Sequence, residues 1–335
     1  DGTEAGTFML KDVNPGPANC DPHQPEMVAS NGLLFFRAED PTNGLELWKS
    51  DGTTAGTVIV KDLMVGASNS GAMPLADVNG TLFFKANDGT NSGLWKTDGT
   101  VANTVFVSGP MPTGSRSFGT VTVMNSTFFY TADNGTSGDE LWKSDGTAGN
   151  AVMVRDCNPG ASSSSIEDMF PYGNTLYFRA DDGVNGVELW KSDGTQSGTN
   201  MVLDINNGSG NGYPHTFVAF NGEVYFSAND GVNGQSLWKT DGTQAGTTLV
   251  VETELGAAGS LQGTIAAGGY MFFSGETTAN GIEPWISDGT QAGSVMVKDM
   301  NVGASHCHPR YFTFCNGVVL FRGRDSNLAV GFELF

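Results

Sequence analysis

The sequence is poor in basic residues, histidine and cysteine. Its 335 residues include 16 Lys and Arg, 4 His and 4 Cys against 36 Asp and Glu, and the formal net charge is −20. Nucleic acids and anionic membrane surfaces are bound through basic patches, so this balance argues against both as partners. No apolar run approaches the roughly 18 residues of a membrane span, so we expect no membrane insertion.

The sequence also lacks the motifs of the common enzyme active sites. It contains no G-x-S-x-G, P-loop, H-E-x-x-H or dinucleotide-binding fingerprint. Pairs of carboxylates do occur, but they recur along the chain, and an active site requires asymmetry. Because no nucleophile and base can be recognised, the sequence favours a role without catalysis.

In place of such motifs the chain carries a repeat of 47 or 48 residues. All six tryptophans fall in one column, at Trp48, Trp95, Trp142, Trp190, Trp238 and Trp285, and Phe335 takes the seventh place. The triplet Asp-Gly-Thr starts at Asp1, Asp51, Asp98, Asp145, Asp193, Asp241 and Asp288. A fixed period of this length indicates a repeat architecture. We therefore predict a single domain of seven repeats, covering 1–50, 51–97, 98–144, 145–192, 193–240, 241–287 and 288–335.

Each repeat has the pattern of four short antiparallel strands. Asn-Gly pairs such as Asn31-Gly32 predict tight hairpins between the first two strands, because both central positions need a positive φ. The Asp-Gly-Thr segment turns the chain between the third and fourth strands. One column in this turn is glycine except at Asn103 and Asn150, which predicts a left-handed backbone there.

Seven four-stranded antiparallel sheets predict an all-β fold, a seven-bladed β-propeller, with an open β-solenoid as the alternative. The phase of the repeat leaves residues 1–12 as a fourth strand without its blade, while residues 311–335 supply only three strands. Proteins avoid unpaired sheet edges. We therefore expect the N-terminal strand to complete the C-terminal blade and close the ring.

The repeated segment, most complete at Glu46–Thr57 and Glu188–Thr199, resembles the E-L-W-x-x-D-G-T-x-x-G-T repeat family of extracellular and surface proteins. The likeness covers essentially the whole chain and weakens at Asn103, Asn150, Pro284 and Phe335. It implies a repetitive β-propeller-like scaffold that is secreted, extracellular or at the cell surface. The resemblance supplies no catalytic residues.

Polar loops between the second and third strands are candidate calcium sites. Their carboxylates are Asp88, Asp133, Asp181, Asp182 and Asp230. Calcium takes six to eight oxygen ligands in flexible geometry, and the glutamate two residues before tryptophan, as in Glu188, would add another. The alternative is that these residues form Asx turns, which satisfy the backbone of the loop. No loop has EF-hand spacing, and both interpretations remain open.

The histidines and cysteines suggest a second site. All four histidines lie in links that lead into a first strand, and Cys20 and Cys307 hold the same place in repeats that become neighbours if the ring closes. Imidazole and thiolate ligands together suit zinc or copper. The candidate ligands are Cys20, His23, His306, Cys307 and His308.

A disulfide is the competing interpretation, either Cys20–Cys307 or Cys307–Cys315, since extracellular proteins commonly contain such bonds. Cys157 is distant along the ring and is expected to be a buried thiol. The Trp column is expected to pack between blades, and the Lys column, with Lys49 and Lys191, to form a solvated strand face.

Four sequons offer sites for N-linked glycans if the protein is a eukaryotic, secreted glycoprotein. They lie at Asn79, Asn125, Asn134 and Asn207.

The sequence therefore predicts a secreted or surface-located scaffold or binding module without enzymatic activity. Adhesion, matrix or filament assembly, self-assembly, and binding of a protein or glycan ligand are the roles favoured, with calcium as a stabilising ion. The alternative is a copper- or zinc-dependent propeller enzyme or metal carrier that uses the Cys/His cluster.

Overall fold

The protein is all-β in the part of the chain that the computed structural model describes, residues 3–20, 22, 27–108, 121–255, 263–325 and 331–335. These residues form strands and turns, and none of them belongs to a helix with the length and apolarity of a membrane span. The strands make seven antiparallel sheets, six with four strands and the last with three. Sheets of four short antiparallel strands were predicted from the repeat, and the structure confirms them.

The chain divides into two compact units, residues 1–156 (unit 1) and 157–335 (unit 2). Unit 1 contains three sheets. The first comprises β1 (Val28–Ser30), β2 (Leu33–Asp40), β3 (Gly44–Ser50) and β4 (Val58–Lys61); the second β5 (Met73–Val78), β6 (Thr81–Asn87), β7 (Ser92–Thr97) and β8 (Val105–Ser108); the third β9 (Thr122–Met124), β10 (Thr127–Asp133), β11 (Asp139–Ser144) and β12 (Val152–Arg155).

Unit 2 contains the other four sheets. They comprise β13 (Glu167–Tyr172), β14 (Thr175–Asp181), β15 (Val187–Ser192) and β16 (Asn200–Leu203); β17 (His215–Phe220), β18 (Glu223–Asn229), β19 (Gln235–Thr240) and β20 (Thr248–Leu255); β21 (Ile265–Ala267), β22 (Tyr270–Thr277), β23 (Gly281–Ser287) and β24 (Val295–Met296); and the three-stranded sheet of β25 (Arg310–Cys315), β26 (Val318–Arg324) and β27 (Phe332–Leu334).

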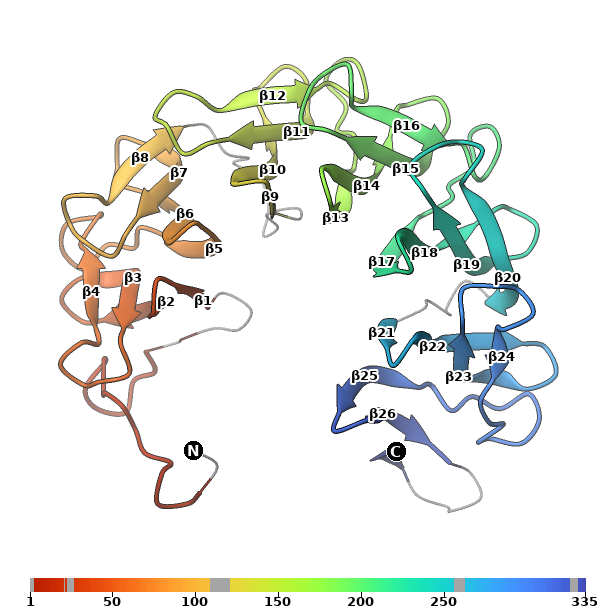
Figure 1. The fold of residues 1–335 in the computed structure, drawn as a ribbon. Helices are drawn as coiled ribbons and strands as arrows, with labels where there is room; N and C mark the ends of the chain where they lie inside the picture. Colours follow the sequence, from red (N-terminus) through yellow and green to blue (C-terminus); the bar gives the residue numbers. More distant parts are fainter. Residues whose placement is uncertain (1–2, 21, 23–26, 109–120, 256–262, 326–330) are drawn as a thin grey trace. The chain divides into compact units, whose positions relative to one another are not determined.

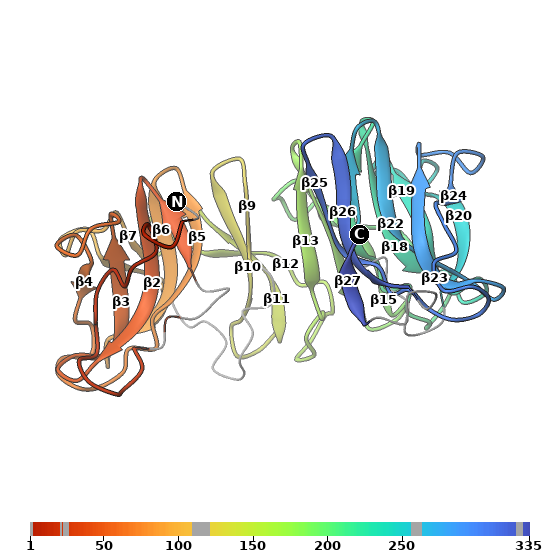
Figure 2. The same cartoon turned by 90° about the horizontal axis from the view of Figure 1, so that it is seen from below.

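Within each unit, successive sheets meet through their first strands. In unit 1 β5 contacts both β1 and β9, and in unit 2 β13, β17, β21 and β25 follow one another in the same way. Figure 1 shows that the first strands of unit 2 lie on one side of their sheets and the fourth strands on the other. Figure 2 shows that the antiparallel strands of a unit lie roughly along one axis. This arrangement of sheets is β-propeller-like.

The hairpins between first and second strands confirm the prediction made from Asn-Gly. Asn31 and Gly32 have φ values of 49° and 76°, and Asn221 and Gly222 have 49° and 85°. Consecutive positive φ values are the signature of the tight turn that matches the twist of the flanking strands.

The left-handed backbone predicted for the second glycine column is wrong. Gly198 has no positive φ, and a Cβ added there would lie 2.1 Å from Oδ1 of Asp193. Glycine is needed because this carboxylate approaches the backbone. Where asparagine replaces it, the side chain donates to the same aspartate: Asn103 Nδ2 lies 2.6 Å from Asp98 Oδ2.

The core lies between successive sheets. One cluster joins Leu189 and Val202 of one sheet of unit 2 to Phe226 and Trp238 of the next. Five of the six tryptophans are at most 9% exposed, as predicted for packing between blades, while Trp142 is half-buried.

The Lys column is not the solvated face that we expected. Lys49 Nζ donates to the carbonyl of Gly99 at 2.7 Å, and Lys191 Nζ donates to Gly242 at 2.7 Å. Each acceptor belongs to the Asp-Gly turn of the following sheet. These lysines therefore join neighbouring sheets.

Candidate functional site

The predicted Cys/His residues hold structural positions where they are described. His23 lies outside the described residues, and Cys20 belongs to unit 1 whereas His306, Cys307 and His308 belong to unit 2. All four cysteines are thiols, so neither disulfide considered from the sequence is present; Cys157 is buried, as predicted. No group of three or more His, Cys, Asp or Glu side chains that could hold a metal occurs among the described residues.

Two contacts show what His306 and Cys307 do. The backbone N–H of Ile282 donates to His306 Nδ1 at 3.0 Å, just as the N–H of Val187 donates to Asn211 Oδ1 at 2.8 Å in an earlier repeat. Burial raises the pKa of the Cys307 thiol to about 11, and its Sγ lies 3.6 Å from Met300 Sδ. The Nδ1 atom of His306 is thus used within the fold, and burial favours the neutral form of the Cys307 thiol.

A buried glutamate lies two residues before the tryptophan in four of the repeats. Glu46, Glu140, Glu188 and Glu283, two residues before the tryptophan column, are all 0% exposed. In unit 2, Glu188 Oε2 accepts the N–H of Ile205 at 2.8 Å and its Oε1 accepts the N–H of Gly212 at 2.7 Å. Glu283 accepts the N–H groups of Met300 and Cys307 in the same way, at 2.9 and 3.2 Å.

Burial raises the pKa of both Glu188 and Glu283 to about 7, although the backbone donors act in the opposite direction. We call this arrangement the glutamate clamp, because one side chain fastens the link that runs from the fourth strand to the next sheet. From the sequence we considered these glutamates only as added calcium ligands. Cys307 takes part in the clamp through its backbone N–H, which donates to Glu283.

The candidate calcium residues form Asx turns. Asp88, Asp182 and Asp230 each accept two backbone N–H groups of their own loop on Oδ1, as in Asp182 with Val184 at 2.9 Å and Asn185 at 2.7 Å. Asp133 and Asp181 each accept one, at 2.7 Å. In Asp88, Asp182 and Asp230 the other oxygen, Oδ2, accepts the side-chain amide of an asparagine in the same loop, so the hydrogen bonds show the turns that were the alternative to calcium sites.

The asparagines of the four sequons are all exposed. They are Asn79 and Asn125 in hairpin turns with positive φ, Asn134 in a loop between second and third strands, and Asn207 in a link.

A polar cluster that breaks the repeat joins the first two sheets of unit 2. Arg179 of β14 pairs with the carboxylate of Glu167, its cross-strand partner on β13, and its Nε lies 3.3 Å from Oδ2 of Asp168. The Arg179 guanidinium lies 5.9 Å from the ring centre of Tyr213, whose carbonyl oxygen is 2.8 Å from Nδ1 of His215 on β17. We call these five residues the Arg179 cluster.

The electrostatics of the Arg179 cluster are unusual for a surface. Burial raises the pKa of Asp168 and lowers the pKa of His215, so the imidazole is neutral at pH 7. Two carboxylates face one guanidinium, and the side chains of Glu167 and Asp168 stay 56% and 38% exposed. The cluster therefore presents a net negative, hydrogen-bonding surface to solvent.

The backbone around the Arg179 cluster is strained. Asp168, Tyr213 and Thr216 have positive φ values of 55°, 44° and 57°, which non-glycine residues seldom adopt. Ser165, His308 and Tyr311 have positive φ values at the matching positions of other repeats, so this backbone conformation belongs to the repeat and does not by itself mark the cluster. From the sequence only the place of His215 in a link was evident; the missed signal is that Glu167, His215 and Arg310 share one column of the repeat.

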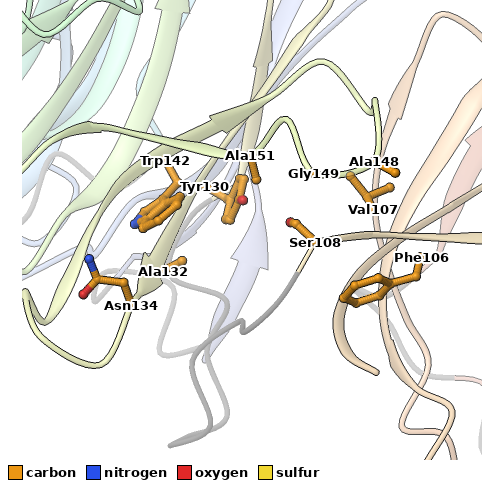
Figure 3. Close-up of a pocket in the computed structure, with 10 residues that line it drawn as sticks. All are labelled: Phe106, Val107, Ser108, Tyr130, Ala132, Asn134, Trp142, Ala148, Gly149 and Ala151. Atoms are coloured by element: carbon orange, nitrogen blue, oxygen red, sulfur yellow. The ribbon is translucent and has the colours of Figure 1, made fainter. Parts of the chain in front are cut away.

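A cavity of about 440 Å³ lies between the second and third sheets of unit 1. Figure 3 shows Tyr130, Trp142 and Asn134 on one side and Phe106 and Val107 on the other. Tyr130 stands in a column that is Phe84 and Phe178 in other repeats, burial raises its pKa, and its hydroxyl interacts with Ser108. We call this cavity the Tyr130 pocket; aromatic side chains line it, whereas charged and polar side chains make up the Arg179 cluster.

No protein-family model matches the chain, and no curated protein matches it in sequence. Solved structures do match its fold. A prolyl endopeptidase studied for inter-domain dynamics in catalysis and specificity aligns over 92% of this chain and 49% of its own, with 12% identity and a TM-score of 0.50. A puromycin hydrolase aligns over 93% and 54%, with 13% identity and a TM-score of 0.46, and the computationally designed Ika8 protein over 95% and 98%, with 14% and 0.37.

The chain spans about half the length of the hydrolases that it matches. The match with the prolyl endopeptidase contradicts the function expected from the sequence, a secreted or surface scaffold or binding module without catalysis, and also its alternative, a copper or zinc enzyme or carrier. The repetition of near-identical sheets was interpreted as evidence for a scaffold. That inference fails because the same kind of fold forms about half of a peptide-cleaving enzyme.

Proposed function

We propose that this chain has a peptidase-related function, as a propeller that positions peptide substrates for a hydrolase catalytic domain. The observation that carries the proposal is the match, over 92% of this chain, with 49% of a prolyl endopeptidase. The match is one of fold, so the argument for function depends on the site that this chain builds on that fold.

The Arg179 cluster supports the proposal because its chemistry suits a peptide terminus. A free α-ammonium group carries a positive charge and three donors, and the exposed carboxylates of Glu167 and Asp168 supply acceptors of opposite charge. The neutral imidazole of His215 adds a hydrogen-bonding group beside them.

Binding of a short proline-containing peptide to the purified chain tests this function. We expect the peptide with a free N terminus to bind, and the Asp168→Asn variant to bind it about tenfold more weakly, which corresponds to ~1.4 kcal/mol. Glu223→Gln is the matched control, because this variant also removes one carboxylate that pairs with a basic side chain. Glu223 Oε2 lies 2.9 Å from Lys239 Nζ. Equal affinity for the N-acetylated peptide, or unchanged binding by Asp168→Asn, would contradict the proposal.

We further propose that the chain forms a closed seven-bladed propeller in which the N-terminal segment supplies the fourth strand of the last sheet. Residues 3–12 form no strand in the structure, but they pack on the first sheet as a fourth strand would. Lys11 Nζ donates to the carbonyl of Thr57 at 2.6 Å, and Lys61, the last residue of β4 and in the same column, donates to the carbonyl of Thr104 at 3.2 Å.

Apolar packing repeats this correspondence. Val13 is 8% exposed and packs with Phe36, Ala38 and Trp48. Leu63, in the same column after β4, packs with the equivalent residues of the second sheet, Phe84, Ala86 and Trp95. The N-terminal segment therefore holds the place of the fourth strand of a preceding blade.

The last sheet offers the complementary gap. It has three strands, and Leu334 of its edge strand β27 is 72% exposed, as are Phe8 at 73% and Met9 at 76% in the N-terminal segment. Pairing the two would cover all three side chains. Deleting residues 1–12 should therefore replace the single cooperative thermal transition by broader melting at lower temperature, and a truncated chain that melts as sharply as the intact one would contradict closure.

A further inference from the structure

The last sheet carries three arginines on one face. Arg310 at the start of β25 lies directly opposite Arg322 of β26, and Arg324 follows two residues later. Cross-strand partners share a face of an antiparallel sheet, and so do residues two apart in a strand. Arg310, Arg322 and Arg324 are the arginine triad, in a chain whose net charge is −20.

In the first sheet of unit 2, two of these three repeat columns hold acidic residues instead of arginine. Glu167 occupies the place of Arg310 and pairs with Arg179, which occupies the place of Arg322; Asp181 occupies the place of Arg324. Like charges directly opposite each other in a sheet are destabilising. The arginine triad thus replaces a cross-strand ion pair by a repulsive pair, which costs stability unless an anion lies between the side chains.

The triad has no counter-charge within the described chain. None of its three side chains forms an ion pair with a carboxylate there. Residues 326–330, which follow β26 in the sequence and lie outside the described residues, are Ser, Asn, Leu, Ala and Val and carry no charge. Glu276 of the neighbouring sheet raises the pKa of His308, and the buried Asp325 raises the pKa of Cys307.

Two further contacts shape the surface around the triad. The guanidinium of Arg322 lies 3.9 Å from the ring centre of Phe332, which orients it flat against the aromatic face and leaves its N–H edge available. The His308 ring lies 6.5 Å from Phe332 and 5.1 Å from His306. Burial lowers the pKa of His308, and His306, Arg310 and Arg324 lower it further, while Glu276 raises it.

We propose that Arg310, Arg322 and Arg324 form a binding site for a small carboxylate ligand on the last sheet. Each guanidinium presents a rigid fork of donors that matches a planar carboxylate with two parallel hydrogen bonds. His308 and the ring of Phe332 border the site and favour an anion with a short organic body. This inference does not depend on the peptidase-related function, because it concerns different residues and a ligand of opposite charge.

Titration of the full chain with succinate at low ionic strength tests the site, since screening by salt weakens exposed charge pairs. We expect one succinate to bind per chain and to raise the melting temperature, because a ligand that binds only the folded state stabilises it. The informative variant is Arg310→Glu, which recreates the Glu167–Arg179 pair of the other sheet. It should fold with an unchanged or higher melting temperature and bind succinate at least about tenfold more weakly.

Lys85→Gln is the matched control, because Lys85 occupies the same repeat column as Arg179 and Arg322. The variant removes one positive charge from a sheet that does not carry the triad. Its affinity for succinate should equal that of the unmodified chain. Inorganic phosphate is the second probe. The proposal fails if succinate neither binds nor shifts the melting temperature, if Arg310→Glu binds it equally well, or if phosphate binds and succinate does not.

Discussion

Replacing Glu188 by glutamine should remove a large part of the pH dependence of stability in unit 2. Glu188 is fully buried, and burial raises its pKa from the ordinary 4.5 to about 7. The folded state therefore binds the proton more tightly than the unfolded state. The resulting stabilisation is fully present below pH 4.5 and is lost as the pH rises through 7. At about 1.4 kcal/mol per pH unit, the rise corresponds to roughly 3 kcal/mol.

Urea unfolding, followed by tryptophan fluorescence between pH 5 and 8.5, measures this effect. The unmodified chain should lose stability across this range, and Glu188→Gln should lose less, by up to roughly 3 kcal/mol, because glutamine stays neutral. Glu4→Gln, which removes an exposed carboxylate, should behave like the unmodified chain. The same pH profile for Glu188→Gln and the unmodified chain would refute the assignment of a neutral, buried glutamate to the clamp.

Two further predictions concern the turn between the third and fourth strands. Ser192→Ala should lower the free energy of unfolding, measured by thermal melting, by about 1–3 kcal/mol. The buried Ser192 Oγ forms a hydrogen bond with Thr199 Oγ1 at 2.7 Å and accepts the N–H of Gly194 at 2.9 Å. A loss no larger than that of Ser197→Ala, at an exposed position, would contradict this. Gly198→Ala should lower the urea midpoint of unfolding more than Gly198→Asn does. An added Cβ meets the Asp193 carboxylate in both variants, but only the asparagine side chain can donate a hydrogen bond to it. The reverse order would show that the contact with aspartate is not the reason for glycine at this position.

The features predicted well from the sequence are those set by neighbouring residues. Asn-Gly hairpins need two positive φ values, and a tryptophan that recurs every 47 or 48 residues in a β-prone segment has to be buried somewhere. The repeat thus leads directly to the sheets and to the packing between them.

The errors arose where the contact of a side chain depends on how the chain folds back on itself. Gly198 looked like a left-handed position because the approach of the Asp193 carboxylate is invisible in sequence. Lys191 looked solvated because its acceptor, Gly242, is 51 residues away. The glutamate clamp, which uses the backbone N–H of Cys307, was not predicted because it appears only once the path of the link is known.

The Arg179 cluster was missed for a related reason. Its members come from two sheets, and only the fold brings Arg179 and Glu167 of one sheet to Tyr213 and His215 of the next. Comparing the repeats column by column would have shown that Glu167, His215 and Arg310 alternate in charge at one position. Variation within a repeat column was the available signal for function.

Closure of the propeller is tested most directly by a disulfide between Met9→Cys and Phe335→Cys, with Cys20 and Cys315 replaced by serine. In the first sheet the equivalent residues, Ile59 and Trp48, are cross-strand partners. Partners in an antiparallel pair have Cα atoms about 4.5–5.5 Å apart, which suits a disulfide. We predict that mild oxidation links the two cysteines within one chain and raises the melting temperature. Met9→Cys with Val184→Cys, an exposed loop residue, should stay unlinked. Absence of the Met9–Phe335 link, or equal linking of the control pair, would contradict a closed ring.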